Sequence, residues 1–383
     1  MSEVDRKELR HELEDSVAEF KVTVLLGPRL SGKTSLTRVL EIPEENAFDL
    51  DDPLDQARLE KPEELLSELR GLVLIDGFQR QPELLPVLLE MASGWVGPSR
   101  FLVVGSRSTE AIKEVAAASA DKVTVIEMGG LSCRDLGGDA EDQRWLRGGI
   151  PGSYFAETDA ASLRVRAGAV QAFLRRDLPG MGINVPAERL RQFMIGAARH
   201  HGETWNSSAI AASLGISHPT ARAYLDLLTE TFVLRQLRPF TSKGKKRMVK
   251  APKVYVRDSG LLHELLEIES MEDLQSSDHR DASWEGFALE QLVSVLELKS
   301  DELFFWATHG GAEIDLVVER GGKRYGFEFK GTDKPGVTHS MTIAKADLEL
   351  DQVYLVHPGE ESFALREGME ALGLVGLAEF ELP

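Results

Sequence analysis

Residues 22–34 read VTVLLGPRLSGKT, and residues 35–40 continue as SLTRVL. A strand-length apolar run is followed by a glycine-rich loop and then by a segment with helical spacing, the order that a phosphate-binding loop requires. Gly27 and Gly32 allow backbone angles that direct successive N–H groups toward phosphate oxygens. The stretch therefore predicts a nucleotide site at the end of a buried strand.

Two side chains of this loop suit a triphosphate with its cation. Lys33 would reach the β and γ phosphates, and the hydroxyl of Thr34 would ligate magnesium. The helix that begins near Lys33 adds the partial positive charge of its first turn. We therefore expect ATP and Mg²⁺ as ligands. The expected nucleotide contacts are Gly27, Pro28, Arg29, Leu30, Ser31, Gly32, Lys33, Thr34, Ser35 and Asp76.

The length and composition of the chain restrict the class of protein, its possible contacts with nucleic acid and its expected compartment. The chain has 383 residues, 42% hydrophobic and 28% charged, which predicts a globular protein of two or three domains. Its formal net charge of −19 would repel phosphates at long range, so any nucleic-acid contact must come from a local basic patch. The single cysteine favours a reducing, cytoplasmic compartment, and no apolar run is long enough to predict a membrane span.

Three regions differ in pattern. In the first, the apolar runs KVTVLLG, GLVLIDG and RFLVVGS alternate with helical segments, which predicts an α/β fold with a parallel sheet. The second is mostly helical by its periodicity, and the third mixes strands with a helix around residues 284–298. We place the domain boundaries at residues 1–152, 153–250 and 251–383.

A second strand of the first region ends in an acid. Residues 71–80 read GLVLIDGFQR, and Asp76 closes the apolar run. P-loop ATPases hold the magnesium shell with a carboxylate in this position. A helix cap is the alternative role for Asp76. The next strand ends in Gly105 and Ser106, where we expect a polar sensor of the γ-phosphate.

Together these segments resemble a known family. The chain resembles AAA-type P-loop ATPases of bacteria and archaea fused to a C-terminal domain of unknown function that is itself similar to PD-(D/E)XK nucleases. The matching segments follow one another in the expected order over nearly the whole chain: GPRLSGKT (27–34), LVLIDGFQR (72–80), FLVVGSRS (101–108), RGGIPG (147–152), FLRRDLP (173–179), KAPKVYVRDSGLL (250–262) and EGFALEQLV (285–293).

Gly77 departs from the family pattern. In AAA-type ATPases a Glu normally follows the magnesium-binding acid and positions the attacking water. Glycine lacks that group, so we expect hydrolysis to slow by about 10²–10⁴-fold. Either another acid substitutes, with Glu83 and Glu90 near in sequence, or the nucleotide is held rather than turned over. The family often forms rings in which an arginine enters the neighbouring site, and the candidates are Arg80, Arg107, Arg175 and Arg176.

The middle region contains a helix-turn-helix pattern. Its sequence, SSAIAASLGISHPTARAYLDLLTE, covers residues 207–230, with Ser217 as the expected cap of the second helix. The strand and basic stretch that follow complete a winged helix. A DNA reader would use Thr220 and Arg222. The basic segment 243–253 would supply phosphate contacts through Lys243, Lys245, Lys246, Arg247, Lys250 and Lys253. A protein-packing module with a solvated loop is the alternative.

A last group of residues lies in EIDLVVE (313–319) and GFEFK (326–330), joined by a glycine turn that predicts a hairpin. Alternation places Glu328 and Lys330 on one face, where Asp315 of the partner strand can join them. Two carboxylates form an oxygen-rich metal site, and a lysine can stabilise developing phosphate charge. This is the D…ExK pattern of the nuclease-like family, in which Glu290, or alternatively Glu285, matches the additional acid. An exposed charged hairpin is the other interpretation.

The sequence thus predicts an AAA-type domain, a winged helix and a PD-(D/E)XK nuclease-like domain. We expect ATP-controlled, metal-dependent action on DNA, with Asp315, Glu328, Lys330 and Glu290 as catalytic residues and Thr34, Asp76, Asp315 and Glu328 as metal ligands. The alternative is an ATP-dependent switch or adaptor that binds DNA or protein without cleaving it. A motor is a third interpretation, which Gly77 disfavours. A homo-oligomer would suit the family.

Overall fold

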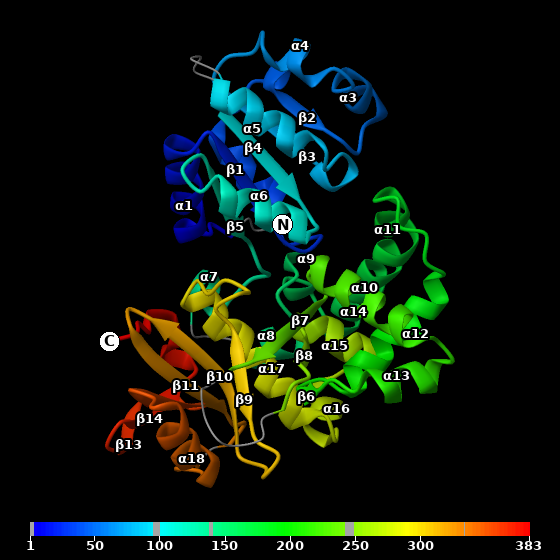
Figure 1. Ribbon diagram of the computed structural model, residues 1–383. Helices are drawn as coiled ribbons and strands as arrows, with labels where there is room; N and C mark the ends of the chain where they lie inside the picture. The colour runs from blue at the N-terminus through cyan, green and yellow to red at the C-terminus, as the bar shows by residue number, and fades with distance from the viewer. Residues whose placement is uncertain (1–3, 95–99, 138–140, 242–248, 333) are drawn as a thin grey trace. The chain divides into compact units, whose positions relative to one another are not determined.

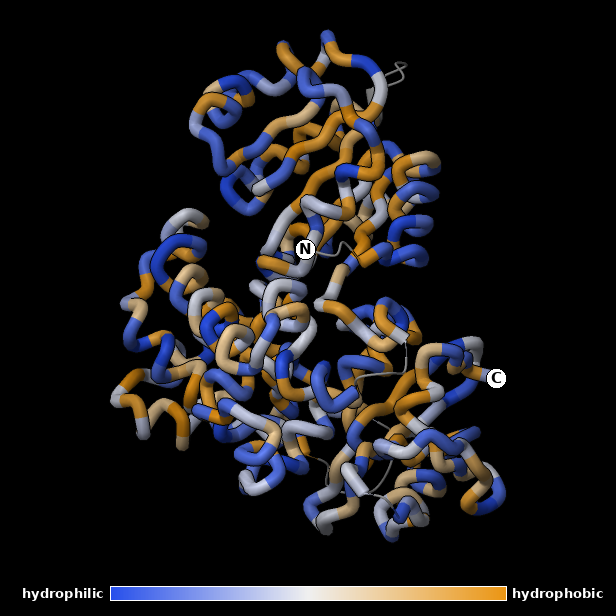
Figure 2. Tube along the Cα trace, turned by 180° about the vertical axis from the view of Figure 1, so that it is seen from behind, coloured by the Kyte–Doolittle hydropathy of each residue, from blue (hydrophilic) through white to orange (hydrophobic). Residues whose placement is uncertain are grey.

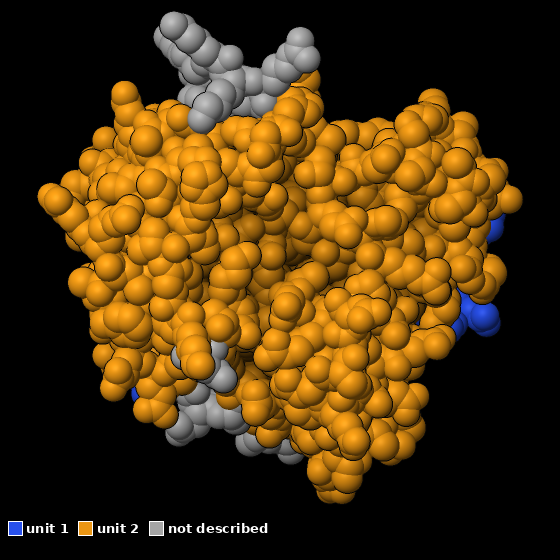
Figure 3. Space-filling view, turned by 90° about the horizontal axis from the view of Figure 1, so that it is seen from below, with its two compact units in different colours: residues 1–130, 171–186, 230–232 blue, residues 131–170, 187–229, 233–383 orange. Residues whose placement is uncertain are grey.

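The chain folds into two compact units, and each is described by itself (Figure 3). The computed structural model describes residues 4–94, 100–137, 141–241, 249–332 and 334–383. Unit 1 comprises residues 1–130, 171–186 and 230–232, and unit 2 comprises residues 131–170, 187–229 and 233–383. The segment 171–186 therefore belongs to unit 1 although the chain on both sides of it belongs to unit 2.

Unit 1 is built on a five-stranded parallel sheet in the order β2-β3-β4-β1-β5 (Figure 1). Every residue of β1 is buried, because helices cover both faces of the sheet. This confirms the parallel sheet that the alternation of strands and helices predicts. The strands are β1 (Val22–Leu26), β2 (Ala47–Asp49), β3 (Leu72–Asp76), β4 (Arg100–Gly105) and β5 (Val123–Glu127).

The two faces of this sheet have separate apolar cores. On one face, Leu13 of α1 and Leu36 of α2 pack against alternate residues of β1, β4 and β5. On the other face, Leu88 of α5 and Ile112 of α6 pack against the intervening residues. The α-helices of unit 1 are α1 (Lys7–Glu19), α2 (Lys33–Thr37), α3 (Pro53–Arg58), α4 (Pro62–Leu66), α5 (Leu84–Gly94), α6 (Glu110–Ala118) and α11 (Leu178–Gly180). Its short turns are η1 (Arg38–Leu40), η2 (Glu44–Asn46), η3 (Phe78–Arg80) and the π-helical η4 (Phe173–Asp177).

Two glycines shape the loop between β1 and α2. A Cβ on Gly27 would lie 2.1 Å from the carbonyl oxygen of Met128, so only glycine allows this close approach. Gly32 precedes α2 with a φ of +98°, a left-handed conformation that glycine adopts without a steric penalty. The loop is therefore held against the segment that follows β5, at the carboxyl edge of the sheet.

Unit 2 contains a nine-stranded mixed sheet in the order β13-β14-β12-β11-β10-β9-β7-β8-β6. The strands are β6 (Glu203–Thr204), β7 (Leu234–Pro239), β8 (Lys253–Val256), β9 (Phe304–Ala307), β10 (Glu313–Arg320), β11 (Lys323–Phe329), β12 (Gln352–His357), β13 (Phe363–Arg366) and β14 (Met369–Gly373). The helices are α7 (Cys133–Leu136), α8 (Glu141–Arg147), α9 (Pro151–Tyr154), α10 (Asp159–Ala172), α12 (Ala187–Arg199), α13 (Ser207–Leu214), α14 (His218–Glu230), α15 (Ser259–Leu265), α16 (Met271–Ser276), α17 (Arg280–Val295), α18 (His339–Leu348) and the 3-10 helix η5 (Val375–Glu379).

Alternate residues of β10, β11 and β12 face opposite sides of the sheet, so this sheet also has two apolar cores. Figure 2 shows hydrophobic stretches, in orange, along the chain of both units. Phe327 and Leu316 pack with Trp284 and Leu292 of α17, whereas Val317 packs with the α18 side. The strand of the expected winged helix, β7, joins the same sheet as the strands of the expected nuclease-like domain. The division of this half into two modules stays a prediction.

Within the described residues, no helix is both long and apolar enough to cross a membrane.

Candidate functional site

The loop of residues 27–34 surrounds the ammonium group of Lys33. Lys33 Nζ donates to the carbonyl oxygens of Gly27 at 2.8 Å and Pro28 at 2.7 Å. Its side chain is buried, and burial lowers the pKa of Lys33 to about 7, an effect only partly opposed by the negative charge of Asp76. Two neutral carbonyl groups stabilise a cation less than an anion would, so this lysine is poised for an anionic ligand.

Thr34 and Asp76 meet at the same edge of the sheet, as the sequence predicts for a magnesium site. Thr34 Oγ1 donates to Asp76 Oδ2 at 3.0 Å, and Gly77 N donates to Asp76 Oδ1 at 2.7 Å. Burial raises the pKa of Asp76 above its ordinary value. A hydroxyl and a carboxylate are hard oxygen donors, so these two residues fit Mg²⁺ bound together with a nucleotide.

Gly77 follows Asp76 with a φ of +77°. A Cβ at this position would lie 3.2 Å from Leu50 Cβ and 3.4 Å from Asp51 N. A glutamate here would therefore be strained in its backbone and crowded in its side chain. Glycine at residue 77 thus suits both the left-handed backbone and the close approach of the chain that leaves β2.

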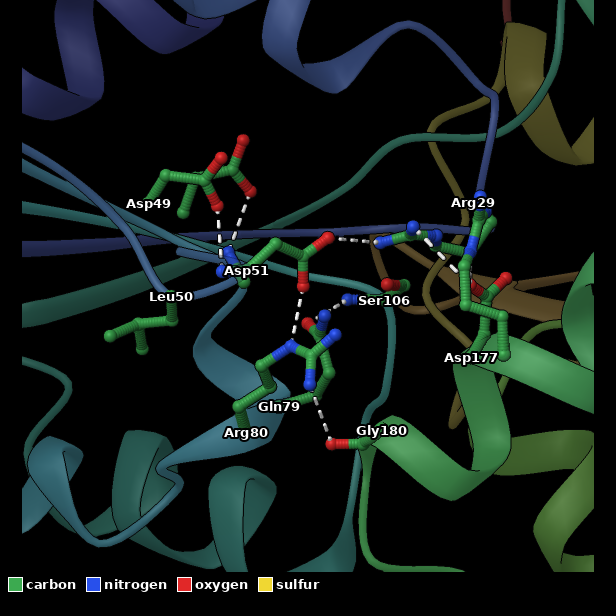
Figure 4. A network of polar contacts seen from close by, with 12 residues as sticks. Arg29, Asp49, Leu50, Asp51, Gln79, Arg80, Ser106, Asp177 and Gly180 are labelled. Carbon is green, nitrogen blue, oxygen red and sulfur yellow. Dashed lines mark hydrogen bonds and ion pairs between the residues drawn. The ribbon is translucent and has the colours of Figure 1, made fainter. Parts of the chain in front are cut away.

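Charged side chains join the loop to two other segments of unit 1 (Figure 4). Arg29 forms ion pairs with Asp51 at 3.5 Å and with Asp177 at 3.3 Å. Asp51 also accepts from Arg80 Nε, and Arg80 Nη1 donates to the carbonyl of Gly180 at 3.2 Å. The phosphate-binding loop is thus linked by side chains to the segment 171–186.

The remaining expected groups of unit 1 are also engaged within it. Ser106, the expected γ-phosphate sensor, is buried, and its N–H donates to Gln79 Oε1 at 3.0 Å. Of the arginines considered for a neighbouring site, Arg107 pairs with Glu230 at 2.8 Å and Arg176 with Asp177 at 3.0 Å, whereas Arg175 is exposed.

In unit 2, the expected hairpin brings Asp315 and Glu328 together. Leu316 lies opposite Phe327 across β10 and β11, so the next residues along, Asp315 and Glu328, are neighbours. Lys330 Nζ lies 3.3 Å from Glu328 Oε1. Glu328 Oε2 is buried and has no hydrogen-bond partner among the described residues.

Lys253 of β8 lies among these acids. Its ammonium contacts Asp315 Oδ1 at 2.9 Å, Glu285 Oε1 at 2.9 Å and Glu313 Oε1. Lys253 is only 4% exposed, yet the surrounding negative charges overcome the effect of burial and raise its pKa well above the ordinary value. We call the group of Lys253, Tyr255, Glu285, Glu313, Asp315, Glu328 and Lys330 the ionic cluster.

The acids of the ionic cluster differ in the direction in which their pKa values are shifted. Burial and the charge of Asp315 raise the pKa of Glu328 to about 8, and they also raise the pKa of Glu285. Burial opposes ionisation of Asp315 too, but Lys253 and Lys330 hold its pKa below the ordinary value. Carboxylates that converge in a buried site cannot all ionise, so the one held by two lysines keeps the charge.

The chain matches known proteins over nearly its full length. The uncharacterized protein Rv2008c of Mycobacterium tuberculosis is 40% identical over 370 residues, which cover 96% of this chain and 83% of the relative. The uncharacterized protein Mb2031c of Mycobacterium bovis matches with the same values. The chain belongs to the family of these two proteins.

Family models divide the chain into three parts. Residues 19–137 match an AAA domain, residues 139–272 match a domain of unknown function (DUF8612), and residues 280–376 match another domain of unknown function (DUF4143). The N-terminal part of this family member is therefore an AAA-type ATPase domain.

Two solved structures show weaker likeness. The Walker-type ATPase PABY2304 of Pyrococcus abyssi is 16% identical, with a TM-score of 0.46, over 69% of this chain and 96% of its own. RuvB T158V of Thermotoga maritima is 18% identical, with a TM-score of 0.29, over 61% of this chain and 88% of its own.

Two expected site residues of this AAA-domain protein have other partners in the structure than the sequence predicts. Glu290, expected as the accessory acid, pairs with Arg235 and with Arg257 at 3.6 Å. Glu285 takes its place in the ionic cluster, because five residues of helix turn the two side chains about 140° apart. Lys253, expected to contact DNA phosphates, is buried among carboxylates, so the basic segment does not include it.

The expected metal site of unit 2 does not fit a divalent ion as it stands. Both oxygens of Asp315 have partners, Oδ1 with Lys253 and Oδ2 with the N–H of Phe329 at 3.0 Å. Among the residues that the structure describes, no group of three or more His, Cys, Asp or Glu side chains is arranged to hold a metal ion. The ammonium of Lys253 lies where a cation would neutralise Asp315.

The helix-turn-helix elements form at the expected places, as α13 and α14. Ser217 Oγ accepts from Thr220 N at 3.2 Å, which confirms the cap. Thr220 is half-buried, and the exposed Arg222 pairs with Asp226 at 2.8 Å on its own helix. Lys250 is exposed, whereas Lys243, Lys245, Lys246 and Arg247 lie outside the described residues.

Sequence reasoning missed Asp51 and the true surroundings of Lys253. Asp51 follows the short apolar strand β2, so an acid just beyond a strand end was an available signal. Lys253 begins the apolar run KVYV, which indicates a position at the start of a buried strand.

We predict that Lys253→Met destabilises unit 2 by about 3–5 kcal/mol, because the variant leaves several buried carboxylates without their cation. The loss should be smaller at acidic pH, where protonation of the acids removes their mutual repulsion. Denaturant unfolding followed by tryptophan fluorescence measures it. Lys330→Met is the matched control, since the Lys330 side chain is 47% exposed, and an equal loss in both variants would contradict the assignment.

Proposed function

We propose that the protein is an ATP-dependent switch. Unit 1 binds ATP with Mg²⁺ and hydrolyses it slowly, and the bound nucleotide controls what unit 2 binds, with DNA as the first candidate and a protein as the alternative. The observation that carries the proposal is the buried Lys33 ammonium, which has only carbonyl partners in a loop of an AAA-type domain.

Each residue of the loop has a separate task in this proposal. Lys33 moves from the carbonyls of Gly27 and Pro28 to the β and γ phosphates, where an anion stabilises its charge. Thr34 and Asp76 hold Mg²⁺, which neutralises charge between the phosphates. Backbone N–H groups of the loop and of the first turn of α2 bind the remaining phosphate oxygens.

We expect slow hydrolysis of ATP because the backbone at residue 77 has a left-handed conformation. The left-handed glycine disfavours a water-positioning side chain at residue 77 itself, so the attacking water must be oriented by a group from another segment, which we expect to be less effective than the usual glutamate. A long-lived bound state suits a switch better than a motor, because a switch must keep its state while the partner is engaged.

The segment 171–186 gives a route from nucleotide to unit 2. Asp177 of this segment pairs with Arg29 of the phosphate-binding loop, and Arg80 donates to Gly180. Phosphates would compete with Asp177 for the guanidinium of Arg29. Since both ends of the segment continue into unit 2, a change in this ion pair acts on the chain of unit 2 directly.

Metal-dependent cleavage of DNA by unit 2 is the second candidate function. It is supported by the convergence of Asp315, Glu328 and Lys330 and by the unpartnered Oε2 of Glu328. The buried Lys253 disfavours it, because a divalent ion would have to displace an ammonium held by three carboxylates.

Cleavage assays separate these two functions. Single- and double-stranded DNA and RNA are incubated with the protein, ATP and either Mg²⁺ or Mn²⁺. We expect binding without cleavage. Metal-dependent cleavage that is lost in Lys330→Ala, with the variant still folded by circular dichroism, would instead establish the nuclease.

The switch itself requires ATP binding at residues 27–34. We predict that Lys33→Ala reduces ATP affinity by at least about tenfold, since it removes a charge-assisted contact to the phosphates. Equilibrium binding of a fluorescent ATP analogue measures this, and Lys61→Ala, an exposed lysine outside the loop, is the control. Equal affinity of wild type and Lys33→Ala would refute the site.

A further inference from the structure

We propose that Asp51 supplies the carboxylate that position 77 lacks and orients the water that attacks the terminal phosphate of ATP. This inference deepens the proposed function and rests on ATP binding at residues 27–34. It assigns a catalytic role to a residue that comes from the loop after β2 rather than from the strand that carries Asp76.

The first support is the space beside Gly77. The atoms nearest to a Cβ at residue 77 are Leu50 Cβ at 3.2 Å and Asp51 N at 3.4 Å, so the chain after β2 packs directly beside that position. Leu50 N donates to the Asp76 carbonyl at 2.8 Å, which fixes this chain against the end of β3. Asp49 of β2 is the register partner of Asp76. The backbone of Asp51 therefore lies beside the position from which the usual glutamate would extend.

The second support is the direction of the Asp51 side chain. Its carboxylate reaches Arg29 of the phosphate-binding loop and Arg80 of η3 (Figure 4). Arg29 lies three residues after the end of β1, within the loop that would surround the phosphates. The Asp51 carboxylate therefore contacts a side chain of the loop that would bind the phosphates.

The third support is the state of the Asp51 carboxylate. Although burial opposes ionisation, Arg80 and Arg29 together lower the pKa of Asp51 below its ordinary value. The group is therefore ionised at neutral pH and acts as an acceptor only. A carboxylate has about four acceptor positions, and the two arginines use only part of them, which leaves capacity for a water molecule.

Other acids near the site are less suited. Glu83 and Glu90 are exposed around helix α5. Asp49 is exposed, and its Oδ1 accepts from Asp51 N at 2.8 Å, so it stabilises the turn that presents Asp51. Neither Glu83, Glu90 nor Asp49 has an ion pair with the phosphate-binding loop among the contacts of the described residues.

In the proposed step, Asp51 accepts a hydrogen bond from the attacking water. The water oxygen forms a bond to the γ-phosphorus, the bond from that phosphorus to the β–γ bridging oxygen breaks, and ADP leaves with the electron pair. The water proton passes to the Asp51 carboxylate and then to bulk water, which leaves ADP and inorganic phosphate. A loose transition state needs orientation of water more than a strong base, so the lowered pKa of Asp51 is compatible with the role.

The test compares Asp51→Asn with the matched control Asp49→Asn on full-length protein. We expect Asp51→Asn to lower the ATP turnover rate by about 10²-fold or more, while ATP affinity stays within a few-fold of wild type. Affinity for ADP with aluminium fluoride, an analogue of the transition state, should fall with turnover, which gives a readout independent of activity. Asp49→Asn should keep turnover and both affinities, because an amide oxygen can still accept the Asp51 N–H.

Specific results would overturn the inference. It fails if the wild-type protein binds ATP but never hydrolyses it. It also fails if Asp51→Asn turns over ATP at the wild-type rate, or if Asp49→Asn lowers the turnover rate as much as Asp51→Asn does. Equal loss of ATP affinity and turnover would show that Asp51 serves only to hold Arg29. Asp51→Ser is the second variant should Asp51→Asn not fold. A wild-type protein that does not bind ATP at all would instead refute the proposed function, so the two failures are distinguishable.

Discussion

Burial of a lysine ammonium is the constraint from which both polar sites follow. In unit 1, Lys33 is buried against two carbonyl oxygens, and its pKa falls to about 7. In unit 2, Lys253 is buried against three carboxylates, and its pKa rises well above the ordinary value. The positive charge of a buried ammonium therefore lacks a sufficient counter-charge in the site of unit 1 and is fully balanced by negative charges in the site of unit 2.

This difference separates a site that needs a ligand from one that already contains its counter-ion. A triphosphate would supply the negative charge that the loop around Lys33 lacks, which links folding of the loop to nucleotide binding. The ionic cluster gains little from a further cation, since Asp315 already contacts Lys253 and a backbone N–H. This balance of charge is the reason why the proposed function assigns the response to nucleotide to unit 1 and binding without cleavage to unit 2.

Much of unit 1 could be predicted because its signals are local. The strand, the glycines and Lys33 with Thr34 are contiguous, and Asp76 ends an apolar run. The ion-pair partners of the loop could not be predicted, because these pairs depend on the packing of segments that are distant in the sequence. Asp51 and Asp177 reach Arg29 from 22 and 148 residues away along the chain (51 − 29 and 177 − 29), and no spacing rule links them. Lys253 is grouped with the basic segment by its charge, although the apolar run that it begins indicates a buried strand, and it is buried in the structure.

Proton uptake on ATP binding tests this account most directly. Calorimetric titration at about pH 8, in two buffers with different ionisation enthalpies, counts the protons exchanged. Without nucleotide, Lys33 has a pKa of about 7 and is mostly neutral at about pH 8, whereas beside the phosphates it becomes charged. The account therefore predicts that close to one proton is taken up per nucleotide bound. It also predicts that the affinity for ATP rises as the pH falls toward 7. Binding that takes up no proton, with the same heat in both buffers, would contradict it.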